Sequence, residues 1–471
     1  MIFKERSERM LKYEKSKAKL VEFDVKKEDY PRFPMNSDDL VYTTLFILSR
    51  YCEELIVDPD SQTTSQLFVE LTSAAQYYNA AVNSEQWLDH NHLFLLLGAT
   101  AYFMSEDFGS AKVLISRIHD WCPKDNLSSL LYFTLCFLLL DTAYPSELQK
   151  ESHTQYAVAM TQHFSAGTRG EPIFSLLSDI RQESLFVSDI LDITYADFLY
   201  GVSFRALCHS AWFLLPQNSR ASMEKWGGYL SKPGSVRLLW PAQKIIVEAG
   251  ALRGQDLIVP FPTGVGKTRS IELIIRSVFM EQGKRVALVV APLRALCNEI
   301  TQDLTAASMT AVINQFSDTA QEDFDLKIQE NQKYILICTP EKFTYILRHQ
   351  PDVLPEINLF IFDEGSVIIT DTGYFDNRKK QTGGGNYKWE SCKKMFDYRH
   401  TEPCGSAILQ LVSPLKVDYN IRFEGETIAK YLVEHYGEPD CFASLKEQLK
   451  TAYQQLVPVS RFQKYNYMIL D

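Results

Sequence analysis

A glycine-containing turn between an apolar run and an amphipathic segment constrains this chain more than any other feature. The turn is Pro262 to Thr268 (PTGVGKT), and it follows LIVP (257–260) and precedes a segment with helical apolar spacing. Between a strand and a helix, such glycines let backbone N–H groups close around phosphate oxygens, and the helix N-terminus adds partial positive charge. The sequence therefore predicts a nucleotide phosphate site here.

Seven consecutive residues of this turn are expected to surround the phosphates of ATP: Pro262, Thr263, Gly264, Val265, Gly266, Lys267 and Thr268. Lys267 would reach the β- and γ-phosphates, and the hydroxyl of Thr268 would ligate Mg²⁺. The strict pattern has Gly or Ala five residues before Gly266, where this chain has Phe261. A chance GKT sequence is the alternative, and the strand and helix predicted on either side argue against it.

An acidic pair ends an apolar run further along the chain. Asp363 and Glu364 close INLFIFDE (357–364), 96 residues after Lys267. At the end of a buried strand, the first carboxylate can hold Mg²⁺, and the second can orient and deprotonate an attacking water. Two solvated acids at a strand end are the alternative. Downstream of the phosphate turn, the pair favours ATP hydrolysis, with Lys267, Asp363 and Glu364 as catalytic residues.

Short apolar runs alternate with helical patterns after residue 235. Four runs are typical of buried parallel strands: LIVP (257–260), RVALVVAP (285–292), YILICTP (334–340) and INLFIFDE (357–364). Between the first two, apolar residues from 271 to 279 follow one helical face, and Gly283 can end that helix. This order predicts a doubly wound α/β domain that binds ligands at the carboxyl ends of its strands.

Residues 1 to about 230 have mostly helical apolar spacing, which indicates an all-helical accessory domain. Its boundary is expected at KWGGYLSKPG (225–234), where Gly and Pro cluster. Residues 95–118 are typical of two helices joined around Asp107, but no second copy supports a repeat array. The 14 apolar residues from Leu127 to Leu140 are too few for a membrane span and predict a buried helix.

The composition narrows the class of protein. With 471 residues, the chain is long enough for two or three domains. Its net charge of −11 argues against a passive nucleic-acid coat or a basic membrane-surface protein, although a narrow basic channel can lie within an acidic shell. The nine scattered cysteines and the charged N-terminus, which lacks an apolar signal region, predict a reduced, cytoplasmic protein without a membrane partner.

Four motifs together resemble those of superfamily 2 DExH-type helicases of the Ski2-like kind. They are PTGVGKT, APLRAL (291–296), TPEK (339–342) and DEGS (363–366), in the order and spacing of helicase motifs I, Ia, Ib and II. The resemblance covers about residues 236–366 and implies ATP-dependent movement on, or unwinding of, nucleic acid, with DNA expected in preference to RNA. It also implies an α/β fold with three parts: a helical accessory or partner-binding domain at 1–230, a RecA-like P-loop NTPase domain at 235–366, and a partial second motor domain with a helical C-terminal segment at 367–471.

The resemblance implies further residue roles. Five residues of two elements correspond to contacts with one nucleic-acid strand: Pro292, Arg294, Thr339, Pro340 and Glu341. Backbone amides at helix starts and an arginine suit such sequence-independent contacts. Gln243, in LLWPAQ (238–243), is similar to the adenine-reading glutamine of the family. The alternatives are a surface arginine in an i, i+4 pair for Arg294 and a surface glutamine at a helix start for Gln243.

The chain departs from the family pattern after the acidic pair. Ser366 stands where the family usually has His or Asp, and VIIT (367–370) directly follows, where the family has a longer stretch that contains a helix. Neither an SAT motif nor an arginine-rich QxxGRxxR motif is found downstream. We hypothesise that the sequence omits segments of a longer protein, with joins near 366 and 385, which an intact mass close to 54.1 kDa would refute. A complete chain should bind ATP but hydrolyse it poorly, for lack of an arginine finger.

The C-terminal portion gives weaker indications. Basic and aromatic residues interleave between 379 and 399 and can hold single strands by charge and stacking, although a solvated loop is the commoner explanation. Residues 426–436 and 445–457 have the spacing of amphipathic helices.

Bacterial antiphage-defence helicases, such as the helicase subunit of the Hachiman system, are similar in their Ski2-like motifs and helical N-terminal region. That similarity implies a protein partner, an effector nuclease, that binds the helical domain. Two other functions stay open: a translocase subunit of a restriction-type complex, and a nucleotide-switched scaffold. The missing second-domain motifs favour the scaffold. Four intact residues oppose it: Lys267, Thr268, Asp363 and Glu364.

Overall fold

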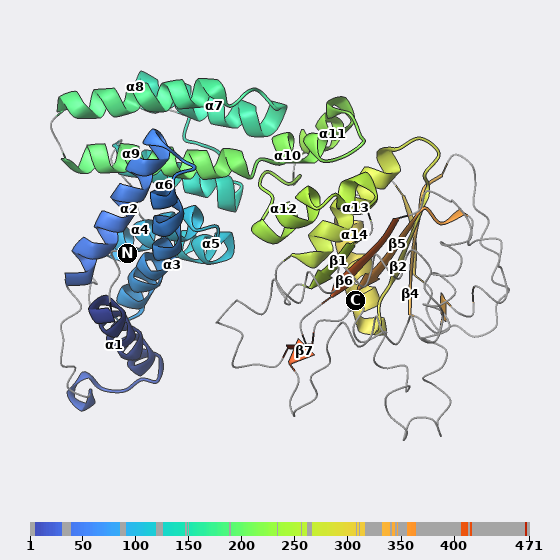
Figure 1. Ribbon diagram of the computed structural model, residues 1–471, viewed down its shortest axis with the longest axis horizontal. Helices are drawn as coiled ribbons and strands as arrows, with labels where there is room; N and C mark the ends of the chain where they lie inside the picture. Colours follow the sequence, from blue (N-terminus) through green and yellow to red (C-terminus); the bar gives the residue numbers. More distant parts are fainter. Residues whose placement is uncertain are drawn as a thin grey trace. The chain divides into compact units, whose positions relative to one another are not determined.

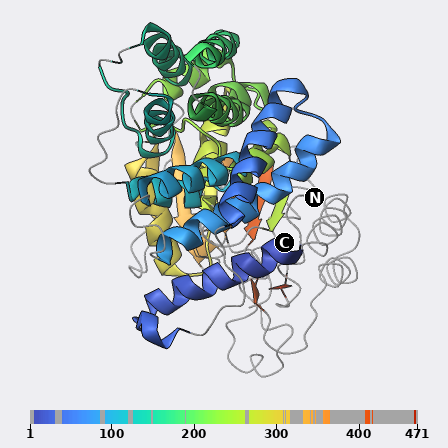
Figure 2. The same cartoon turned by 90° about the vertical axis from the view of Figure 1, so that its left-hand side faces the viewer.

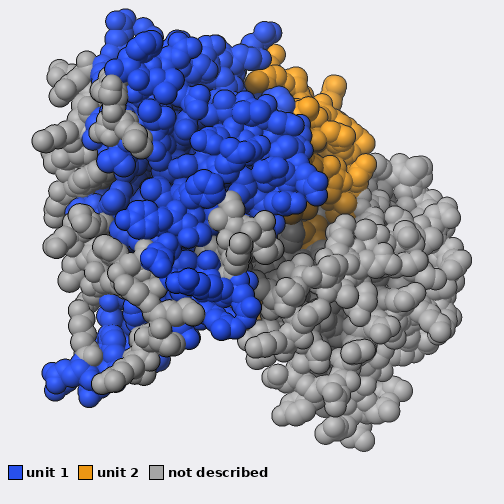
Figure 3. Space-filling view, turned by 60° about the vertical axis from the view of Figure 1, so that its left-hand side comes forward, with its two compact units in different colours: residues 1–213, 229–241 blue, residues 214–228, 242–471 orange. Residues whose placement is uncertain are grey.

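The computed structural model describes the chain in segments: residues 5–30, 39–84, 91–118, 126–146, 148, 150–187, 190–232, 234–255, 257–260, 266–307, 309, 311–315, 332–339, 342–343, 346, 356–363, 407–412, 415–416 and 467–468. The chain forms two compact units (Figure 3). The first comprises Met1–Phe213 and Tyr229–Pro241, and the second comprises Leu214–Gly228 and Ala242–Asp471.

The described residues of the first unit are mainly helical, as the apolar spacing predicts. The helices are α1 (Glu5–Glu22), η1 (Lys27–Asp29), α2 (Asp39–Val57), α3 (Gln62–Asn83), α4 (Asn91–Met104), α5 (Phe108–Ser116), α6 (Leu127–Leu140), α7 (Glu151–Ala166), α8 (Glu171–Val187) and α9 (Ile190–Cys208). Neighbouring helices pack side by side, α2 on α3 and α7 on α8 among them (Figures 1 and 2). The core between them includes fully buried aromatic side chains such as Tyr77, Phe103 and Phe198.

Two local predictions for this unit are confirmed. The helix α6 has the bounds expected for a buried helix, and it begins where the Asn126 side chain accepts a hydrogen bond of 3.0 Å from the backbone N–H of Ser129. The helices α4 and α5 form the expected pair, with Asp107 as the N-cap of α5. Within the described part of the chain, no helix is long and apolar enough to cross a membrane.

The second unit is built on a six-stranded, all-parallel sheet (Figure 1). Its strands lie in the order β1-β6-β5-β2-β4-β3. Their bounds are β1 (Leu257–Pro260), β2 (Val286–Val290), β3 (Val312–Gln315), β4 (Tyr334–Cys338), β5 (Leu359–Asp363) and β6 (Ala407–Val412). The four predicted strands are confirmed as β1, β2, β4 and β5. The strands β3 and β6 were not predicted, and β6 completes the sheet between β1 and β5.

Helices connect the strands with a regular handedness. The helices of this part are α12 (Pro241–Glu248), η3 (Ala251–Arg253), α13 (Lys267–Met280) and α14 (Arg294–Ala306). The chain advances in one direction along the sheet from β1 through α13 to β2, and from β2 through α14 to β3. Because such parallel crossovers are right-handed, α13 and α14 lie on the same face of the sheet. A separate antiparallel pair joins β7 (Leu415–Lys416) to β8 (Tyr467–Met468).

One segment expected in the helical domain packs with the α/β unit. The helices α10 (Ala211–Gln217) and α11 (Met223–Leu230) carry the chain out of the first unit and back. Within the second unit, Lys225 Nζ donates a hydrogen bond of 2.6 Å to the Met280 carbonyl at the end of α13. Arg253 donates one of 3.0 Å to Asn218 Oδ1. Helical spacing alone does not distinguish this segment from its neighbours. A single boundary near residue 230 therefore does not describe the division, because residues 214–228 belong to the second unit and residues 229–241 to the first.

Candidate functional site

The sheet register brings the predicted motifs to one edge. The last residue of β1, Pro260, pairs with Val412 at the end of β6, while Asp363 at the end of β5 pairs with Leu411. Val290, which ends β2, pairs with Phe362 on one side and Cys338 on the other. The residues that follow these strands therefore face one shared edge, where open parallel sheets bind their ligands.

The phosphate turn is described from Gly266 onward. Gly266 is the N-cap of α13, with a left-handed φ of +86° and no side-chain cap hydrogen bond. Lys267 and Thr268 form the first turn of this helix and are half-buried. The first N–H groups of a helix have no partner within the helix, so they are placed to bind an anion. The predicted phosphate contacts Pro262, Thr263, Gly264 and Val265 lie outside the described residues.

Gln243 lies against this turn. Gln243 belongs to α12 and is 5% exposed, and a Cβ built on Gly266 would approach its Nε2 to 2.9 Å. The alternative of a surface glutamine is therefore wrong. Gly266 is constrained twice, because its φ is strained for other residues and because a side chain there would displace Gln243. Adenine reading by Gln243 stays a prediction.

Asp363 supplies the acidic part of the site. It is the last residue of β5, and its Oδ1 atom is buried. A carboxylate and a hydroxyl oxygen, from Asp363 and Thr268, are ligands that Mg²⁺ prefers, so this donor set fits the ion. Glu364, the predicted catalytic base, lies outside the described residues.

The predicted nucleic-acid contacts follow β2 and β4. Pro292 is buried, whereas Arg294 is exposed at the start of α14. The N-cap of that helix, Leu293, makes no side-chain cap hydrogen bond and is itself 59% exposed. Thr339 follows β4, and its hydroxyl accepts a long hydrogen bond of 3.5 Å from the backbone N–H of Lys342. Pro340 and Glu341 lie outside the described residues.

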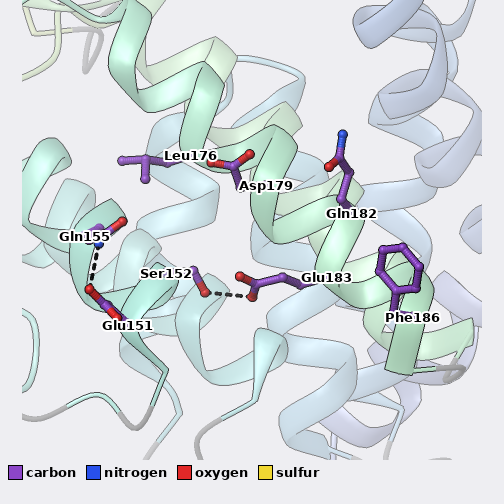
Figure 4. A pocket seen from close by; sticks show the side chains of 8 residues that line it. All are labelled: Glu151, Ser152, Gln155, Leu176, Asp179, Gln182, Glu183 and Phe186. Carbon is purple, nitrogen blue, oxygen red and sulfur yellow. Dashed lines mark hydrogen bonds between the residues drawn. The ribbon is translucent and has the colours of Figure 1, made fainter.

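A cleft of about 460 Å³ between α7 and α8 has a different character (Figure 4). It is lined by Glu151, Ser152, Gln155, Leu176, Asp179, Gln182, Glu183 and Phe186. Ser152 donates a hydrogen bond of 2.8 Å to Glu183, and Gln155 donates one of 3.1 Å to Glu151. Three carboxylates in one cleft repel phosphate, so this cleft does not suit a nucleotide or a nucleic-acid backbone.

Comparisons with known proteins agree with the motifs. Residues 240–380 match the family described as DEAD/DEAH box helicase. The chain is 32% identical over 134 residues to the ATP-dependent DNA helicase Hel308 of Pyrococcus abyssi. That alignment covers 28% of this chain and 18% of that protein. The chain is also 20% identical over 367 residues to the Hachiman protein HamB of Bacillus cereus. That alignment covers 72% of this chain and 32% of that protein.

The chain thus spans under a third of the length of these curated relatives. The two similarities also differ in extent. The match to Hel308 is comparable in length to the DEAD/DEAH box segment. The match to HamB includes more residues than lie between 240 and 471, so it also includes residues before 240.

Proposed function

We propose that this chain, whose residues 240–380 carry a DEAD/DEAH box helicase domain of the superfamily 2 type, is an ATP-dependent helicase or translocase that moves on nucleic acid, on DNA in preference to RNA. The observation that carries the proposal is the shared sheet edge: Asp363 ends β5 there, and Lys267 and Arg294 begin the helices that follow β1 and β2. The parallel sheet and its crossovers support a RecA-like fold. Because β6 (Ala407–Val412) lies in this sheet, the fold extends beyond the bound expected at residue 366.

ATP would bind between the phosphate turn and the end of β5. The N–H groups at the start of α13 and the Lys267 ammonium would hold the β- and γ-phosphates, and Gln243 would contact the adenine. Thr268 and Asp363 would hold Mg²⁺, which neutralises phosphate charge. Glu364 would accept a proton from the attacking water.

Nucleic acid would bind where α14 begins. An exposed arginine and a helix N-terminus without a side-chain cap suit the phosphates of one strand. The turn that starts at Thr339 would supply the second contact. Such contacts read the backbone rather than the bases, so binding would depend strongly on salt and weakly on sequence.

The helical domain would bind a protein partner, an effector nuclease in antiphage defence. Two observations support this part of the proposal. The similarity to the Hachiman protein HamB extends before residue 240, beyond the DEAD/DEAH box segment. The helical unit also carries the acidic cleft, whose lining residue Phe186 is 87% exposed, and Leu185, which precedes it in the chain, is 54% exposed. Exposed apolar side chains next to a polar rim are typical of protein interaction sites.

The experiment is ATP hydrolysis by the purified chain, alone and with single-stranded DNA, duplex DNA or RNA. Lys267→Ala and Glu364→Ala remove a phosphate contact and the predicted base, and Lys112→Ala, an exposed lysine on α5, is the matched control. We expect stimulation by DNA that the first two substitutions abolish and the control retains. ATP binding without turnover would instead favour the nucleotide-switched scaffold.

A further inference from the structure

A buried carboxylate on α13 holds two arginines of the same helix. Glu272 is 2% exposed. Arg276 Nε donates a hydrogen bond of 2.6 Å to Glu272 Oε1, and Arg269 forms an ion pair with Glu272 Oε2. Arg269 belongs to the first turn of the helix, next to Thr268. Glu272 thus joins the start of α13, where the phosphates would bind, to its middle.

Arg276 extends this link to the neighbouring helix. Its Nη2 donates a hydrogen bond of 2.5 Å to the carbonyl of Ala307, the C-cap residue of α14. The last carbonyls of a helix have no partner within it, and they favour a cation. One guanidinium therefore connects the carboxylate on α13 to the end of α14, the helix that begins at Arg294.

Stability alone is a poor reason for this arrangement. Removing charges from water costs as much as a buried ion pair usually gains, and apolar side chains would pack two helices on a sheet at least as well. Directional hydrogen bonds do something that apolar contacts do not, since they fix the position of one helix relative to the other. Arg276 is 13% exposed, so little solvent is present to replace either of its partners.

We propose that Glu272 and Arg276 are positioning residues that transmit the state of the phosphate turn to α14, and so couple ATP binding to nucleic-acid affinity. The proposal rests on the function proposed above. Neither residue is among the predicted contacts with ATP or nucleic acid. A shift of the first turn of α13 on ATP binding would move Arg269 and Glu272, and the Arg276 hydrogen bond would carry that shift to α14.

The test is a thermodynamic cycle. The affinity for a fluorescent single-stranded DNA is measured with and without a non-hydrolysable ATP analogue, and the ratio is the coupling factor. By linkage, DNA must change the affinity for the analogue by the same factor, which checks the measurement. The variants are Glu272→Gln, which keeps the shape and removes the charge, and Arg276→Lys, which keeps the charge and removes the fork of donors.

Arg220→Ala is the matched control. Arg220 pairs with Glu281 at the other end of α13, at 3.7 Å, and forms no hydrogen bond or ion pair with α14 in the described part of the chain. We expect the wild-type coupling factor, about fivefold or more, to persist in Arg220→Ala and to fall to within about twofold of unity in both other variants. The affinity for each ligand alone should change little, because neither side chain is among the predicted ligand contacts.

One outcome overturns the proposal. It is a coupling factor that stays at the wild-type value in Glu272→Gln and Arg276→Lys, whether or not thermal stability falls, since an unchanged factor is the result of a purely structural brace. If Glu272→Gln does not fold, the charge-retaining Arg276→Lys decides. Absence of coupling in the wild type would contradict the proposed function as well, so failure of the two proposals can be distinguished.

Discussion

Gln243 and Gly266 are in close approach at the start of α13. A Cβ on Gly266 would lie 2.9 Å from Gln243 Nε2, and Gly266 has a φ of +86°. The contact joins α12 to the phosphate turn, so the residue expected to read adenine is held beside the residues expected to hold the phosphates. Glycine is required at position 266 for two separate reasons: the left-handed backbone, and the lack of space for a side chain beside Gln243.

We expect Gly266→Ala to reduce both stability and nucleotide selectivity. The left-handed backbone would cost about 1–2 kcal/mol of unfolding free energy. The new methyl group would meet the flexible end of the Gln243 side chain. That end can move away at small cost, but it would then no longer lie where it is expected to contact adenine. Binding of ATP should therefore weaken at least about tenfold, or 1.4 kcal/mol, with loss of any preference over GTP, as measured by competition with a fluorescent nucleotide.

Gly283→Ala is the matched control for that experiment. Gly283 has a similar φ of +79°, but nothing lies within 4 Å of a Cβ built on it. It should show the same loss of stability with unchanged nucleotide selectivity. Equal selectivity in the two variants would contradict a role for the Gln243 contact.

The sequence predicted those parts of the fold whose signals are local. LIVP is β1 to the residue, and the apolar run from Leu127 to Leu140 is α6. The strand β6 has a comparable apolar run, AILQLV, but no motif lies beside it. Its place between β1 and β5 depends on parallel pairing with residues far away in the sequence, which a local pattern does not contain.

The site shows the same distinction. The phosphate turn and the acidic pair could be read from residue types and spacing, because backbone amides and carboxylates act there directly. Burial could not be read: Gln243 was as consistent with a surface position as with a buried one. The spacing of Arg269, Glu272 and Arg276 is usually that of a solvated helix face, whereas Glu272 is buried in the fold.

We expect the free energy of unfolding to fall as the pH drops below about 6.5, the ordinary pKa of histidine. Burial lowers the pKa of His163, so the unfolded chain binds a proton there before the folded chain does. The stability is therefore fully present above the unfolded pKa and decreases as the pH falls toward the folded pKa. In the fold, Nδ1 lies 2.6 Å from the Thr168 carbonyl and donates to it, so Nε2 accepts from Ser210 at 2.8 Å.

Chemical denaturation at pH 7 and pH 5 tests this dependence. His163→Gln, which keeps a polar side chain without a titrating group, should be less stable at pH 7 and should lose less stability between the two pH values. His92→Gln, on α4, is the matched histidine control. A pH dependence that is identical in wild type and His163→Gln would rule out His163 as its source.

Truncation of two phenylalanines of the helical unit should change the unfolding free energy by very different amounts. Phe198 is fully buried on α9, and Phe198→Ala should cost about 3–5 kcal/mol because it leaves a cavity in a packed core. Phe186 is 87% exposed beside the acidic cleft, so Phe186→Ala should change the unfolding free energy by less than about 0.5 kcal/mol. Denaturant melts of both variants test this. A large cost at Phe186 would mean that the side chain packs within the chain and is not available to a partner.

Arg294→Ala should weaken single-stranded DNA binding equally for all sequences. The exposed guanidinium at the start of α14 would neutralise one phosphate, so its loss should reduce the slope of log affinity against log salt by about 0.7. Fluorescence anisotropy between low and moderate salt, with homopolymeric and mixed strands, measures both quantities. Lys112→Ala on α5 removes an exposed positive charge elsewhere and should leave the slope unchanged. If Arg294→Ala keeps the wild-type slope, or weakens binding to only one sequence, Arg294 does not act as a backbone contact, and the proposed interface at α14 is wrong.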